Sequence, residues 1–169
     1  MTVTPVSHEA LLLDNLRRTV ADCETFRDCV GASNRAEAEA LIFGIYALDD
    51  DEAGGVARAV VYLDDNAVAR LAGNDLWNEE EQLVLLIELS PPEELTDLWD
   101  QQVWFFNQVG AIRKEMKSLG NPGADPGAGP YLSVTELNRR MVGLQDPKRN
   151  NGRSIWGIEY SVQWRGGIG

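Results

Sequence analysis

The sequence is poor in the residues on which most enzyme and metal sites depend. Its 169 residues include one histidine, His8, and two cysteines, Cys23 and Cys29. Nucleophile arrangements of the Ser-His or Cys-His kind would need His8, and no pattern brings it beside a serine or cysteine. The cysteines lie six residues apart, which is neither a C-x-x-C motif nor a zinc-ligand spacing. The sequence therefore predicts no catalytic centre, no metal, no cofactor, and two reduced cysteines.

Long apolar runs and basic charge are also scarce. No run reaches the roughly 18 apolar residues of a membrane span, and the first residues lack the basic and apolar regions of a signal peptide. The chain carries 27 acidic and 15 basic side chains, a net charge of −12. Affinity for DNA and for anionic lipid surfaces comes from Lys and Arg. We therefore expect a cytoplasmic protein whose net negative charge attracts neither nucleic acid nor a membrane surface.

The charge is divided unevenly along the chain. From Met1 to Ile112, 6 basic and 22 acidic residues give −16, whereas from Arg113 to Gly169, 9 basic and 5 acidic residues give +4. The densest acidic run fails as a calcium loop, because an EF-hand frame started at its first residue places Ala53 at position 5. A solvated turn is the simpler interpretation of this run, which comprises Asp49, Asp50, Asp51 and Glu52.

Hydrophobic periodicity predicts one α/β domain over residues 1–169. Helices are expected at 7–23 and 24–30, then after Asn34 with Glu37 in the capping-box position, and from Pro91-Pro92 to Leu119. Strands are expected at 41–48, 56–63, 83–89, 131–142 with a bulge, and 156–165. The segments 64–81 and 120–130 are expected to be loops, the second rich in Gly and Pro and without the order of a phosphate-binding loop.

The long helix carries several aromatic residues. Its apolar period predicts Trp99 and Phe106 on the buried side and Trp104 on the opposite, polar side. An outward tryptophan is typical of a protein interface, so we interpret Trp104 as an interface anchor or as part of a second core layer. Asp97 and Asp100 lie on the same helix, but no opposing carboxylate pairs with them, which disfavours an enzyme that uses carboxylates alone.

The order of elements resembles a known family. The chain has an amphipathic first helix, a turn with Phe26, Val30 and Gly31, an Ala-rich short helix before a strand, a long helix, and a last strand from Trp156 to Arg165. This order is similar to that of the tail terminator and tail completion proteins of long-tailed bacteriophages, which join head to tail. The resemblance implies an α+β fold with a mainly antiparallel sheet, flanked by an N-terminal helix and one long central helix.

The resemblance also implies a non-catalytic virion protein, made in the host cytoplasm. Its partners would be further copies of itself in a ring, a hexamer, together with the tail tube protein and the head connector protein. The acidic turn Asp49–Glu52 would face the channel, so that DNA passes without specific binding. Opposite charges would join neighbouring subunits. The candidate interface residues are Trp104, Arg139, Arg140, Lys148, Arg149 and Arg153.

An alternative of another class stays open. The second interpretation is a cytoplasmic small-ligand-binding or regulatory α/β domain, in which the Gly/Pro loop at 120–130 closes over a pocket beside the long helix. A ring in solution or a capped tail tube would favour the structural role. A monomer bound to a small molecule would favour the alternative.

Overall fold

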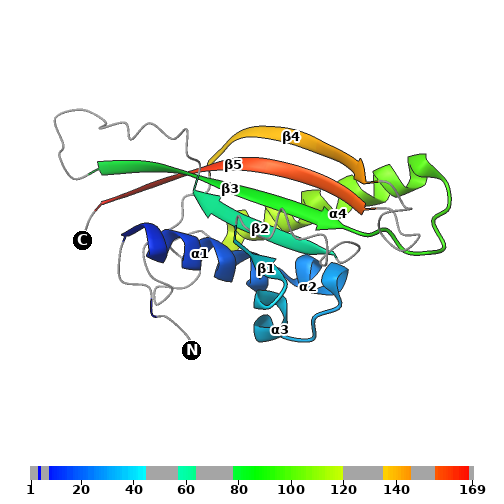
Figure 1. Cartoon of the computed structure of the whole chain (residues 1–169), viewed down its shortest axis with the longest axis horizontal. Coiled ribbons are helices and arrows are strands. Elements are labelled where there is room, and N and C mark those ends of the chain that lie inside the picture. The colour runs from blue at the N-terminus through cyan, green and yellow to red at the C-terminus, as the bar shows by residue number, and fades with distance from the viewer. Residues whose placement is uncertain are drawn as a thin grey trace.

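The computed structural model describes Thr4 and residues 8–44, 57–63, 78–119, 135–145 and 155–167. The helices are α1 (His8–Asp22), α2 (Glu24–Val30), α3 (Arg35–Glu39) and α4 (Leu98–Leu119), and the strands are β1 (Ile42–Phe43), β2 (Arg58–Leu63), β3 (Asn78–Leu89), β4 (Thr135–Gln145) and β5 (Ile155–Gly167). The strands form one sheet in the order β1-β2-β3-β5-β4 (Figure 1).

The sheet is mainly antiparallel, as predicted. Only β1 and β2 run parallel, and the other three pairings are antiparallel, so the sheet is mixed. Figure 1 shows α4 passing behind β3 and β5, while α1, α2 and α3 gather beside β1 and β2. The fold is therefore of the α+β class, with the sheet flanked by the N-terminal helix and the long helix.

The central strand β3 is buried on both faces along its second half. Every residue from Leu83 to Leu89 is buried, which confirms the prediction made from its continuous apolar run. Alternate residues of this run contribute to the core against the helices, where they meet Trp156, Ile158 and Tyr160 of β5. The helices contribute a further set of side chains to this core, namely Leu16, Val20, Phe26, Phe105, Val109, Ile112 and Met116.

Local sequence signals set the ends of the short helices. The predicted α2 ends at Gly31, which adopts the left-handed conformation at φ 72° that glycine tolerates best. The Asn34 side chain caps α3 by accepting a hydrogen bond from the Glu37 N–H at 3.0 Å. In turn, the Glu37 carboxylate accepts one from the Ser33 N–H at 2.7 Å. Both helices follow the sequence-based prediction.

Two predicted boundaries were wrong. The long helix begins at Leu98 rather than at Pro91-Pro92, because Leu95 N–H closes a turn onto the Pro92 carbonyl and the Asp97 side chain then caps α4. Residues 78–81, predicted as loop, belong to β3, whose backbone pairs with β5 from Asn78↔Gly167 to Leu89↔Trp156. The polar, acidic sequence of these residues favours a loop, but pairing with the distant strand β5 makes them a strand.

The other predicted strands are placed as follows. β4 shows the expected irregularity, with register shifts between Glu136 and Asn138 and between Met141 and Gly143. In the segment 41–48, only Ile42–Phe43 forms a described strand, and residues 45–48 lie outside the described part, as does the Gly/Pro loop.

Candidate functional site

The helix α4 has a buried face and an exposed face. The buried face comprises Gln101, Phe105, Val109, Ile112 and Met116, which recur at the helical period and pack into the core. About a third of a turn away, the side chains of Trp99, Val103 and Phe106 remain 69%, 42% and 37% exposed.

The predicted orientation of the tryptophans is therefore reversed. Trp104 is half-buried and packs against the core, which matches the alternative of a second core layer. Trp99 and Phe106, predicted as buried, are the exposed aromatic residues. The prediction took the apolar period through Trp99 and Phe106 as the buried stripe, whereas the buried stripe of α4 begins with the polar Gln101.

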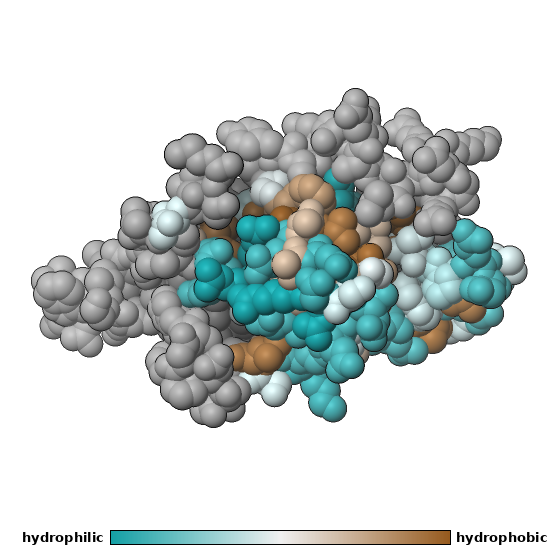
Figure 2. All heavy atoms as spheres, turned by 90° about the horizontal axis from the view of Figure 1, so that it is seen from below, coloured by the Kyte–Doolittle hydropathy of each residue, from teal (hydrophilic) through white to brown (hydrophobic). Residues whose placement is uncertain are grey.

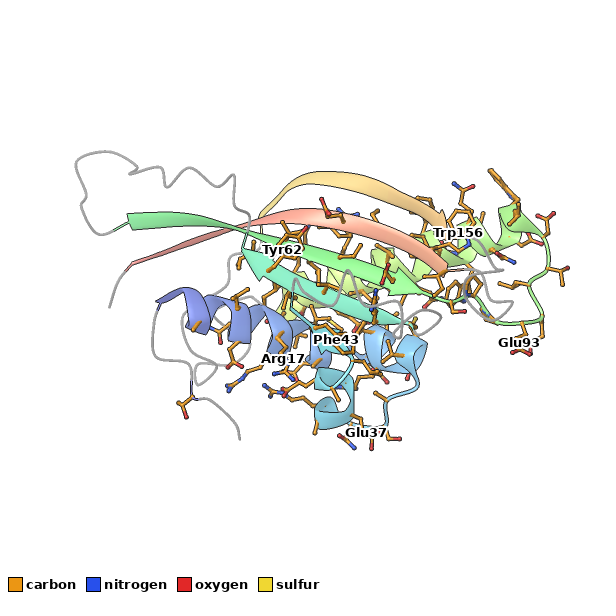
Figure 3. The ribbon with its side chains drawn as sticks, in the orientation of Figure 1. Arg17, Glu37, Phe43, Tyr62, Glu93 and Trp156 are labelled. Carbon is orange, nitrogen blue, oxygen red and sulfur yellow. The ribbon has the colours of Figure 1, made fainter. Side chains whose placement is uncertain are left out.

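A series of contacts holds the first half of α4 against the beginning of β5. The Gln101 amide donates to the Leu95 carbonyl at 2.7 Å and accepts from the Trp156 indole N–H at 3.3 Å. The Phe105 ring stacks on Trp156 with centroids 6.1 Å apart, and Phe106 meets Phe105 edge-on at 5.6 Å. Figure 3 shows Trp156 beside this part of α4. These contacts orient Phe106 before any partner arrives.

Charge is graded along α4 and the turn before it. Exposed carboxylates surround the beginning of the helix, at Glu93, Glu94, Asp97 and Asp100. The last two turns carry Arg113, Lys114 and Lys117, and the Arg113 guanidinium lies 5.3 Å from the centroid of the Tyr160 ring. The exposed face is thus acidic at its start, apolar in its first half and basic at its end, an arrangement that the helix dipole favours.

The face that carries α1 and α3 has a different character. Figure 2 shows a mainly hydrophilic surface there. Arg17 of α1 donates to the Glu39 carbonyl at 2.8 Å, and Arg35 pairs with Glu39 at 2.9 Å. These charges serve contacts within the chain, so α4 offers the more distinctive surface for a partner.

A buried ion pair lies on the opposite face of the sheet. The Nε atom of Arg58 lies 2.6 Å from Oε2 of Glu88, and the two residues face each other across β2 and β3. The same guanidinium lies 6.0 Å from the centroid of the Phe43 ring, and the nearby Tyr62 hydroxyl donates to Glu159 at 3.3 Å. Because the two charges are buried together and paired, we assign this cluster to the stability of the fold.

The two cysteines are free thiols with raised pKa values. Burial raises the pKa of Cys23 to about 12, and Glu115 adds to the rise. Burial, followed by Asp28, raises the pKa of Cys29 to about 11. Glu115 itself accepts hydrogen bonds from the N–H and hydroxyl of Thr25, which joins α4 to α2. Because the thiolate is the nucleophile, these raised pKa values predict slow reaction of both cysteines at neutral pH.

Most predicted interface and channel residues lie outside the described part of the chain. This holds for Asp49, Asp50, Asp51, Glu52, Lys148, Arg149 and Arg153. Arg139 and Arg140 belong to β4, where they pair in register with Tyr160 and Glu159 of β5. Their interface roles stay predictions. Asp97 and Asp100 lie at the start of α4, where Asp97 serves as the helix cap.

No protein-family model matches the chain, and no curated protein matches it in sequence. Among the described residues, no three His, Cys, Asp or Glu side chains gather as a metal site would require. No helix in the described part is long and apolar enough to cross a membrane. We take the face of α4 that carries Trp99, Val103 and Phe106 as the candidate functional site, because its large apolar side chains are exposed.

Proposed function

We propose that this chain is a structural subunit of a long-tailed bacteriophage, which caps the tail tube and joins it to the head connector without catalysis. The observation that carries the proposal is the exposed face of α4, with Trp99, Val103 and Phe106 between an acidic and a basic end. Aromatic residues are enriched in protein interfaces, and a few of them supply most of the binding free energy.

The α+β architecture supports the same proposal, because the resemblance in element order implies this class of fold. In the assembled particle, six copies of the chain form a ring, and α4 contacts the tail tube or the connector. The acidic residues 49–52 face the channel, where their charge repels passing DNA. The basic C-terminal third contacts the neighbouring subunit.

The test adds the purified protein to growing tubes of the tail tube protein from the same phage. We expect electron microscopy to show rings at tube ends and tubes that stop lengthening and accept heads. The variant Trp99→Ser should lose capping while it stays folded, because the indole is largely exposed. Tubes that grow unchanged in the presence of folded native protein would contradict the proposal, and a monomer that binds a small molecule would favour the alternative.

Two further variants distinguish the α4 face from the proposed contact between subunits. Leu119→Ser changes an exposed apolar residue of α4 that lies outside the Trp99–Phe106 stripe, and it should leave capping intact. Reversing Arg149 and Arg153 to Glu should weaken ring assembly, because the proposed contacts between subunits pair opposite charges. Rings indifferent to that double reversal would exclude these two residues from the subunit contact.

A further inference from the structure

The exposed residues of α4 recur at a spacing that suits a second helix. Trp99, Val103, Phe106, Gly110 and Lys117 are exposed and follow one another at intervals of four, three, four and seven residues. The half-buried Arg113, whose guanidinium lies over the Tyr160 ring, stands between Gly110 and Lys117 and completes the alternation of three and four. This is the spacing of the a and d positions of a coiled coil. The face is separate from the stripe that already packs into the core, so α4 has the pattern of a helix with two contact faces.

We propose that α4 of a second copy covers this face, and that the two helices run antiparallel. The charge gradient decides the direction. An antiparallel pair brings Asp100 of each copy opposite Lys114 of the other, twice by symmetry. A parallel pair would instead place the basic ends of both helices together, which is unfavourable.

The shape of the face fits the same arrangement. A two-fold axis near Gln108 places Phe106 of each copy opposite Gly110 of the other, and Trp99 opposite Lys117. A Cβ built at Gly110 meets no atom within 4 Å, so the helix surface is open where the Phe106 ring would pack. Phe106 is already oriented by Phe105. Lys117 would place its ammonium near the Trp99 ring, which is a favourable cation–π geometry.

This dimer goes beyond the proposed function and does not rest on it. A two-fold contact uses one patch twice, whereas a ring needs two different patches on each subunit. If the same face of α4 also binds the tail, the dimer must open before assembly. The dimer is therefore tested in the absence of any tail component, and its failure would leave the capping experiment unaffected.

The first test is a charge exchange followed by sedimentation velocity over a range of protein concentrations. Asp100→Lys and Lys114→Asp should each weaken dimerisation at least about tenfold, because each creates two like-charged contacts. Combining them should restore the native dimer, since the opposite charges face each other again. The matched control exchanges Asp14 and Arg18, an exposed pair on α1, and should change nothing.

The second test is Gly110→Leu, which fills the space assigned to Phe106 of the other copy. We expect this variant to be monomeric and still folded, because Leu is a better helix former than Gly and meets no neighbour. A native chain that is monomeric throughout would overturn the proposal. So would a dimer that is indifferent both to Gly110→Leu and to the single charge reversals.

Discussion

Breaking the Arg58–Glu88 ion pair should destabilise the chain strongly. The two side chains are only 7% and 6% exposed and their charged atoms lie 2.6 Å apart. Glu88→Gln keeps the size of the side chain but removes its charge from beside a buried guanidinium, which costs about 3–5 kcal/mol. At roughly 2–4 °C per kcal/mol for a chain of this size, the melting temperature should fall by about 6–20 °C.

The assay is urea unfolding followed by far-ultraviolet circular dichroism, with thermal melting beside it. Asp14→Asn is the control, because it breaks the solvent-exposed Asp14–Arg18 pair and should cost no more than about 0.5 kcal/mol. Replacing both members with Arg58→Met and Glu88→Leu should recover most of the loss, since neither charge then stays buried. A loss below about 1 kcal/mol for Glu88→Gln would refute the reasoning.

Further outcomes follow from the core, a helix cap and the thiols. Phe105→Ala should lower the free energy of unfolding by about 3–5 kcal/mol in the same urea assay, because a fully buried ring is lost. Asn34→Ala should lower it by about 1 kcal/mol, because α3 loses its cap. At pH 8, alkylation of Cys29 by iodoacetamide should be about a hundredfold slower than for a thiol of pKa 9.0 and should speed up as the pH approaches 11. Rapid labelling of the folded chain at pH 8 would contradict that burial.

Features encoded locally could be predicted from the sequence. Gly31 and Asn34 mark helix ends because their own conformations and side chains determine the boundary. The apolar run Leu83–Leu89 predicts a central strand because a strand covered on both faces has no polar side. The mixture of helices and strands follows from such elements together, whereas the mainly antiparallel sheet was implied by the resemblance in element order.

Features that depend on distant segments could not be predicted in this way. The pairing of residues 78–81 with the end of β5 is set by the partner strand rather than by their acidic sequence. The orientation of Trp99 and Trp104 depends on which stripe of α4 meets the sheet, and that stripe runs from Gln101 to Met116. The spacing of Trp99, Val103 and Phe106 is visible in the sequence, but only the structure shows that these side chains stay exposed.

Oxidative footprinting of Trp99 tests most directly whether the exposed face of α4 is a protein-contact surface. Brief hydroxyl-radical exposure is followed by mass spectrometry of the chain when dilute, when concentrated, and with tail tubes. The buried Trp156 serves as the internal control for unfolding. We predict that Trp99 oxidises readily in the dilute chain and severalfold more slowly in the other two samples, while Trp156 stays protected. Equal oxidation of Trp99 in all three samples would contradict the account.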